Sequence, residues 1–143
     1  EEEKEISSTR GMKLTAETSP YYSAWVQSSE DDLTAMRKAL AEKDFEHVGE
    51  LSEYSCLKMH GLAMAARPGI IYWNATTLEL IQEVRHLRQQ GIPAYFTIDA
   101  GPQVKILCQP ESASKLVDQF LGFPGVQSVI HTTVGPSARV LSG

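Results

Sequence analysis

One acidic residue, Asp99, stands in the sequence TIDAGPQ where two apolar segments meet. An Asp ahead of Gly and Pro is a common turn former, because its side chain can bond its own backbone. Its neighbours Ile98 and Ala100 are apolar, however, and the loop carries no other polar side chain. A carboxylate partly desolvated in such a loop has a raised pKa, which suits proton transfer or contact with a hydroxyl. Local sequence therefore leaves two interpretations of Asp99, a turn residue or a catalytic carboxylate.

A second candidate is SSTRGM, residues 7–12, which contains Ser8, Thr9 and Arg10 in a row. Hydroxyls, a guanidinium group and backbone N–H groups together can hold phosphate oxygens. A hydroxyl-rich stretch is also a common composition for an ordinary loop. The residue types alone do not separate a phosphate site from such a loop.

Other reactive side chains do not form a recognisable site. None of the four histidines stands at metal-ligand spacing from a Cys, a Glu or another His, so we predict no metal site. We expect His60 to be a packed or capping residue. Cys56 and Cys108 belong to no CxxC pair, which indicates two buried, reduced thiols. The chain also contains neither GxxxxGK[ST] nor GxGxxG, so we expect it to be unable to hold nucleotide phosphates alone.

Length and composition predict one globular domain. The 143 residues are 42% apolar and 22% charged, with a net charge of −5. No Lys/Arg cluster points to nucleic acid, and no apolar run approaches the roughly 20 residues of a membrane span. The acidic start EEEKEISS is unlike a signal peptide and lacks an initiating Met. We therefore expect a piece of a longer chain.

The elements that position these residues follow from hydrophobic periodicity and from Gly and Pro. We predict a lead strand and a loop around Gly11 over residues 1–18. Helices are predicted at 21–43, with SSEDD as a possible break, at 45–66, at 76–90 and from Pro110. Strands are predicted at 92–98, 103–108 and 126–134, with one more possible at 138–141. This order predicts an α+β fold, an antiparallel sheet backed by helices.

Three segments together resemble one family. SSTRGMKLTAETSPYY, IIYWNATTLELI and YFTIDAGPQVKIL are similar to the C-terminal half of diphosphomevalonate decarboxylases, which belong to the GHMP kinase superfamily. The likeness continues through the late GPSARVL and covers nearly the whole chain. It implies the GHMP C-terminal fold. It also implies an enzyme that uses ATP and Mg²⁺ to phosphorylate the 3-hydroxyl of mevalonate 5-diphosphate, and then releases phosphate and CO₂ to form isopentenyl diphosphate.

The resemblance also implies residue roles. Asp99 falls on the family's catalytic aspartate, and Ala100 contacts substrate through its backbone. Ser8 falls on a serine that contacts ligand phosphates, and Met12 on a neighbouring pocket residue. Many bacterial members carry Arg where this chain has Thr9, so either Arg10 reaches the diphosphate or that contact is absent.

Several expectations come from the resemblance alone. The nucleotide-binding loop and a substrate arginine lie in an N-terminal half that precedes residue 1, so this chain by itself is expected to be inactive. A cytoplasmic homodimer is implied. The alternatives are a phosphomevalonate decarboxylase or related small-molecule kinase, and a non-catalytic ligand-binding or dimerisation module in which Asp99 has no role beyond its turn.

Overall fold

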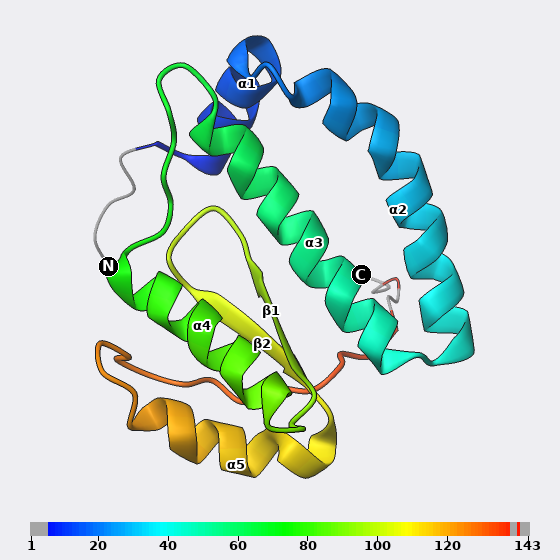
Figure 1. The fold of residues 1–143 in the computed structure, drawn as a ribbon, viewed down its shortest axis with the longest axis vertical. Coiled ribbons are helices and arrows are strands. Elements are labelled where there is room, and N and C mark those ends of the chain that lie inside the picture. Colours follow the sequence, from blue (N-terminus) through cyan, green and yellow to red (C-terminus); the bar gives the residue numbers. More distant parts are fainter. Residues whose placement is uncertain (1–5, 138–139, 141–143) are drawn as a thin grey trace. The chain divides into compact units, whose positions relative to one another are not determined.

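The structure, a computed structural model, describes residues 6–137 and 140. The chain divides into two compact units, Glu1–Gln109 and Pro110–Gly143. In the first unit the order is α1 (Ser8–Thr18), α2 (Tyr22–Glu42), α3 (Phe45–Met64), α4 (Ala75–Gln89), β1 (Ala94–Ile98) and β2 (Val104–Cys108) (Figure 1). The second unit contains α5 (Pro110–Leu121). The predicted α+β class with an antiparallel pair of strands is confirmed.

Helix α1 replaces the predicted loop around Gly11. The Ser7 side chain caps the helix by accepting a hydrogen bond from the Arg10 backbone N–H. A side chain does not fit at Gly11, because a Cβ there would lie 2.2 Å from the Tyr72 hydroxyl oxygen. The glycine that indicated a loop in the sequence is instead the point where a helix passes close to an aromatic side chain.

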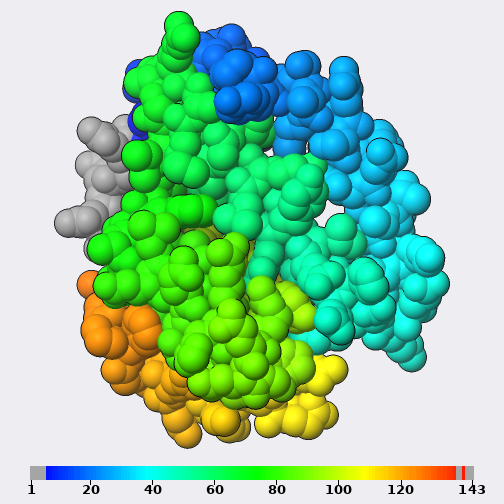
Figure 2. All heavy atoms as spheres, viewed as in Figure 1, coloured from blue at the N-terminus to red at the C-terminus, as the bar shows by residue number. Residues whose placement is uncertain are grey.

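Helix α2 is continuous, so the possible break at SSEDD does not occur. Ser28 and Ser29 both donate to the Trp25 carbonyl, at 3.2 and 2.7 Å, and Asp32 pairs with Lys58 of α3. Small openings are visible between α2 and α3 (Figure 2), and nearer the turn that joins the two helices their residues line a hollow of about 460 Å³. Among the described residues, we find no helix with the length and apolar character needed to cross a bilayer.

The predicted hairpin is confirmed with its register. β1 and β2 pair antiparallel, from Ala94 opposite Cys108 to Ile98 opposite Val104. β1 is almost wholly buried and packs against α3 and α4. Because successive side chains of a strand point to opposite faces, Tyr95 meets Gly49 of α3 while Phe96 lies beneath Arg85 of α4.

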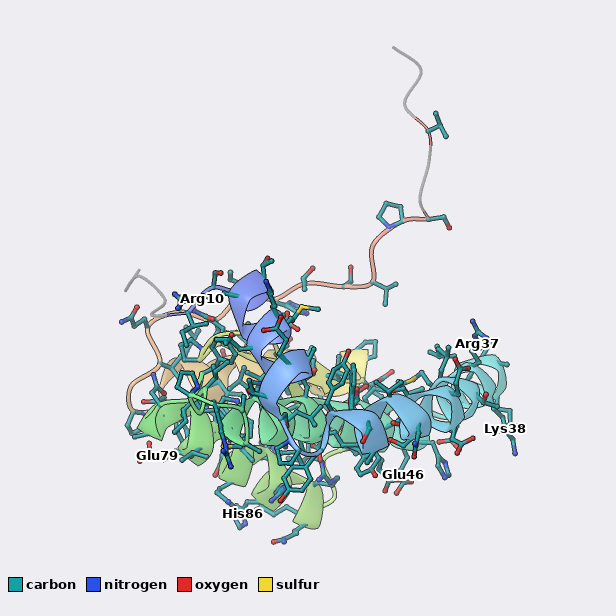
Figure 3. The ribbon with its side chains drawn as sticks, turned by 90° about the horizontal axis from the view of Figure 1, so that it is seen from above. Arg10, Arg37, Lys38, Glu46, Glu79 and His86 are labelled. Atoms are coloured by element: carbon teal, nitrogen blue, oxygen red, sulfur yellow. The ribbon has the colours of Figure 1, made fainter. Side chains whose placement is uncertain are left out.

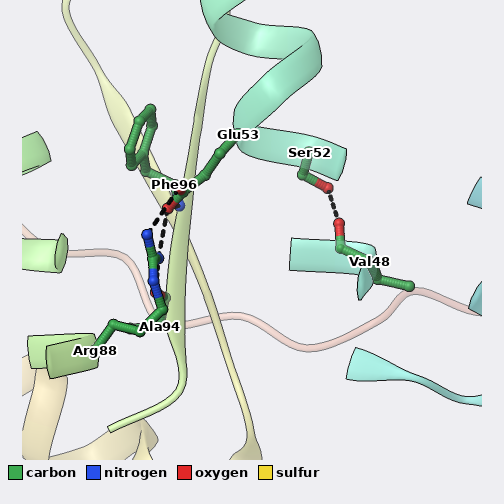
Figure 4. A network of polar contacts seen from close by, with 6 residues as sticks. All are labelled: Val48, Ser52, Glu53, Arg88, Ala94 and Phe96. Atoms are coloured by element: carbon green, nitrogen blue, oxygen red, sulfur yellow. Dashed lines mark hydrogen bonds and ion pairs between the residues drawn. The ribbon is translucent and has the colours of Figure 1, made fainter. Parts of the chain in front are cut away.

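The edge of β1 that faces away from β2 is satisfied by side chains instead of a third strand (Figure 4). Glu53 of α3 accepts from the Phe96 N–H at 3.1 Å. Arg88 of α4 donates to the Ala94 carbonyl at 2.7 Å and pairs with both Glu53 oxygens at 2.8 and 3.0 Å. An unpaired buried backbone group is costly, and these side chains supply the hydrogen bonds that a third strand would otherwise provide. β1 can therefore be the edge strand of the sheet.

Gly49 tests the contact between α3 and β1. A Cβ at this position would lie 2.1 Å from a ring carbon of Tyr95, which is itself buried. We expect Gly49→Ala to lower the free energy of unfolding by about 1–3 kcal/mol, since the helix or the ring must shift. Chemical unfolding measures the change.

Gly61→Ala, in the same helix, is the matched control because no atom lies within 4 Å of its built Cβ. Replacing this glycine should stabilise the protein by up to about 1 kcal/mol through helix propensity. Equal effects of the two substitutions would contradict the packing assigned to Gly49.

The second unit departs from the sequence-based prediction after α5. Helix α5 begins at Pro110, as predicted, and buries Ala113, Leu116 and Phe120. The predicted strand 126–134 is wrong, because these described residues form no regular element and pair with no strand. Val134 is 98% exposed, and β propensity without a partner or a buried face is insufficient for a strand. Most of the predicted strand 138–141 lies outside the described residues.

Candidate active site

Asp99 lies directly after β1, at the tip of the hairpin. Its side chain is 81% exposed, and Oδ2 lies 2.6 Å from the Nζ of Lys105 on β2. The residues that the structure describes therefore do not desolvate this carboxylate, which was one possibility for such an apolar loop. The hairpin therefore presents a solvent-accessible carboxylate that is paired with Lys105.

The backbone around Asp99 is held more firmly than its side chain. The Ile98 carbonyl accepts from His60 Nε2 at 3.1 Å and from Cys56 Sγ at 3.6 Å. The Asp99 carbonyl accepts from the Gly101 N–H at 2.8 Å. Since a carbonyl only accepts, the His60 proton sits on Nε2. The arrangement fixes the peptides on both sides of Asp99 and leaves its carboxylate accessible.

The expected packed role of His60 is confirmed, and Cys56 belongs to the same cluster. Burial lowers the pKa of His60 from its ordinary value of 6.5, against the opposing effects of the Ile98 hydrogen bond and the Asp99 charge. Burial likewise raises the pKa of Cys56. Both side chains are thus neutral hydrogen-bond donors near neutral pH. Both cysteines are free, as predicted, although Cys108 is only half-buried.

The phosphate candidates lie on the first turns of α1. Ser8, Arg10 and Met12 are all exposed, and Met12 is 74% exposed. Arg10 projects from the outer side of the helix (Figure 3). The first turn contains no acidic residue, so its backbone N–H groups, the helix dipole and the Arg10 guanidinium all favour an anion.

The two groups of candidates belong to the same unit and are linked through residues of α3 and of the segment that follows it. Gly11 of α1 lies against Tyr72, and the Tyr72 ring packs edge-on against His60 at 6.1 Å between centroids. His60 in turn holds the Ile98 carbonyl. The fold thus connects the SSTRGM segment to the Asp99 turn through a series of direct contacts.

Sequence reasoning missed Lys105, whose position has a readable signal. Lys105 stands opposite Thr97 in the hairpin register, and Thr97 and Asp99 share a face because strand side chains alternate. A lysine at this position of the second strand is therefore within reach of Asp99. The roles of His60 and Cys56 had no comparable signal, since they depend on how α3 packs on β1.

The Lys105–Asp99 pair is expected to contribute little to stability. Both side chains are more than half exposed, and water screens such a pair. We expect Lys105→Met to change the free energy of unfolding by less than about 0.5 kcal/mol in a denaturant titration. A loss of several times that amount would show that the pair is structural and not an accessible contact of the carboxylate.

Comparison with known proteins identifies the family to which the chain belongs. The family model described as the mevalonate 5-diphosphate decarboxylase C-terminal domain matches residues 1–135. The chain belongs to this family. The resemblance read from SSTRGM and DAGP is thereby confirmed.

The relatives name the activities found in this family. The chain is 29% identical to a diphosphomevalonate decarboxylase of Candida albicans, over 99% of this chain and 44% of the relative. It is 31% identical to a phosphomevalonate decarboxylase of Haloferax volcanii, over 71% of this chain and 32% of the relative. A solved structure, MDDEF in complex with MVAPP, AMPPCP and magnesium, matches at 40% identity with a TM-score of 0.80, covering 86% of this chain and 38% of the other. The chain thus spans less than half the length of the proteins it matches.

Proposed function

We propose that this chain is the C-terminal, substrate-binding half of an ATP-dependent mevalonate 5-diphosphate decarboxylase, which makes isopentenyl diphosphate. The observation that carries the proposal is the exposed carboxylate of Asp99, presented by a hairpin whose backbone is held in place. Membership in the family supports the assignment of Asp99, by resemblance, as the counterpart of the catalytic aspartate. This activity belongs to the whole enzyme, and the 143-residue chain alone is expected not to turn over.

In this proposal Asp99 works on the 3-hydroxyl of the substrate. Its carboxylate orients that hydroxyl or accepts its proton while the oxygen is phosphorylated. When phosphate leaves and CO₂ is lost, positive charge develops on the neighbouring carbon, and the same carboxylate stabilises it. In the structure Lys105 donates a hydrogen bond to the Asp99 carboxylate. Because both side chains are exposed, the carboxylate is free to turn to a substrate hydroxyl.

The beginning of α1 takes the diphosphate end of the substrate. Ser8 contributes its hydroxyl and the first-turn N–H groups, and Met12 lines the adjacent pocket. Arg10, one place beyond the arginine of many bacterial relatives, contributes positive charge from the same turn. The Ala100 backbone contacts the substrate beside Asp99. Phosphate recognition at a helix N-terminus with an added guanidinium agrees with the chemistry of these groups.

ATP and Mg²⁺ are assigned mainly to an N-terminal half of the same protein. Within the described residues, no three His, Cys, Asp or Glu side chains are grouped to hold a metal ion. The solved relative MDDEF carries AMPPCP and magnesium together with MVAPP. ATP supplies the phosphoryl group when bound, and the N-terminal half would also cover the exposed Asp99. A cytoplasmic homodimer completes the proposal, by analogy with the family.

A second candidate is a phosphomevalonate decarboxylase, because the Haloferax volcanii relative is about as similar in sequence as the diphosphate enzyme. The two candidates differ only in the number of phosphates at the distal end of the substrate. In the proposal, the contacts that Ser8 and Arg10 make with the phosphates therefore decide which of the two substrates is preferred.

The test is an assay of the full-length protein, or of this chain co-expressed with its N-terminal half. We expect equal amounts of ADP and CO₂ from mevalonate 5-diphosphate, only when ATP and Mg²⁺ are both present. A higher kcat/KM with mevalonate 5-phosphate would select the second candidate. ADP without CO₂ would indicate a kinase, and a folded protein with no turnover of either substrate would indicate a non-catalytic module.

A further inference from the structure

The peptide bond that joins Ile98 to Asp99 is held by two side chains of α3. His60 Nε2 donates to the Ile98 carbonyl at 3.1 Å, and Cys56 Sγ donates to the same oxygen at 3.6 Å. Fixing this peptide plane fixes the backbone direction from which the Asp99 side chain leaves the chain. Of the two donors the imidazole is the stronger, because a thiol is a weak hydrogen-bond donor.

His60 is itself immobilised on every side that the structure describes. Its residue is 2% exposed. Its ring lies 4.6 Å from the Trp73 ring and 6.1 Å from the Tyr72 ring, measured between centroids. A donor confined by packing in this way holds its acceptor within a few tenths of an ångström, which is the tolerance that catalytic groups need.

The same packing reaches the phosphate-binding segment. Tyr72, which contacts the His60 ring, also lies so close to Gly11 that no side chain fits between them. A shift of the His60 ring therefore affects α1 and the Asp99 turn together. The His60 imidazole thus lies between α1 and the Asp99 turn in this series of contacts.

We propose that His60 is a positioning residue for Asp99, acting through the Ile98 carbonyl. The inference rests on the proposed function, in which Asp99 is the catalytic carboxylate. It goes beyond that function by assigning a buried side chain that touches no substrate atom. A core histidine that only fills space would make a different prediction, since any ring of similar size would replace it.

The experiment compares two substitutions in the full-length protein. His60→Gln keeps an N–H donor that reaches the position of Nε2, whereas His60→Phe keeps the ring volume and removes the donor. We expect His60→Phe to lower kcat by about 10- to 100-fold with both KM values within about twofold. His60→Gln should retain kcat within about threefold. Equal kcat values for the two variants, or a better kcat for His60→Phe, would overturn the proposal.

Leu62→Ala is the matched control for packing loss, because Leu62 lies in the same helix, is buried and makes no bond to the Asp99 turn. At a temperature where the protein stays folded, we expect its kcat to be unchanged. A drop in kcat as large as that of His60→Phe would show that general loosening of α3, and not the missing donor, disturbs catalysis.

A second readout tests the anchoring without relying on turnover. Hydrogen exchange of the peptide covering residues 96–103 should be faster in His60→Phe than in wild type, and unchanged in His60→Gln and Leu62→Ala. If the wild-type protein shows no decarboxylation but this exchange pattern holds, the proposed function fails while the anchoring stands. If turnover is normal and exchange is the same in all four proteins, the positioning role fails while the proposed function stands.

Discussion

If the proposed function is correct, we expect Asp99→Asn in the full-length protein to lower kcat for decarboxylation by about 10²- to 10⁴-fold, the range over which a positioned acid or base contributes. The amide keeps the size of the side chain but removes the negative charge, so it can neither accept the hydroxyl proton nor stabilise positive charge on the substrate. KM values should stay within a few-fold because, in the proposed function, the substrate phosphates are bound by α1. Steady-state assays of CO₂ and ADP release measure both quantities.

The stability of the variant separates catalysis from folding. Asp99 is 81% exposed and its partner Lys105 is also exposed, so Asp99→Asn should unfold at nearly the wild-type denaturant concentration. Glu46→Gln is the matched control, an exposed acid near the beginning of α3 (Figure 3). Retention of activity within a few-fold in Asp99→Asn would restore the other interpretation of this residue, an ordinary turn former.

The second large effect is expected from Glu53. Its carboxylate is 7% exposed and accepts three hydrogen bonds, two from Arg88 and one from the Phe96 N–H. Glu53→Ala leaves the guanidinium and a buried N–H without their partner. Breaking a buried pair in this way costs about 3–5 kcal/mol, a large part of the total stability of a domain. Urea titration of wild type and variant measures the loss.

A double-mutant cycle shows whether the charge pair is responsible. The Glu53 hydrogen bond is the main cause of the raised pKa of Arg88, and the guanidinium also stacks on Tyr95 at 4.6 Å. Arg88→Met should destabilise strongly, because it leaves a buried carboxylate unpaired. Glu53→Ala combined with Arg88→Met should be more stable than the sum of the two single losses predicts. Strict additivity would contradict the coupling.

The hairpin was predictable because its signals are local. Segments rich in β-branched and aromatic residues on the two sides of Asp-Ala-Gly-Pro define two strands and a turn, and the structure places β1 and β2 within those limits. The helices over residues 45–66 and 76–90 were predicted for the same reason, from apolar periodicity and, for the first of them, from Asp44 as a cap, and the structure adds Asn74 as the cap of the second.

Two predictions failed where the deciding contact is distant in sequence. Gly11 indicated a loop, yet it lies in a helix, and the reason for a glycine there is that Tyr72, about 60 residues later, leaves no room for a side chain. Residues 126–134 have strand composition, but a strand forms only where a partner satisfies its backbone, and the described residues provide none. Neither outcome is contained in a local pattern.

The sequence by itself determined the helices α2 to α5, the hairpin, the family and the identity of the candidate residues, because residue types, caps and turn formers act over a few positions. Only the tertiary structure decided how Asp99 is presented. It leaves the carboxylate exposed beside Lys105, and it anchors the preceding carbonyl with His60 and Cys56. The reason is physical: exposure and hydrogen-bond partners depend on which buried groups the packing of α3 against β1 brings within about 3 Å of one another.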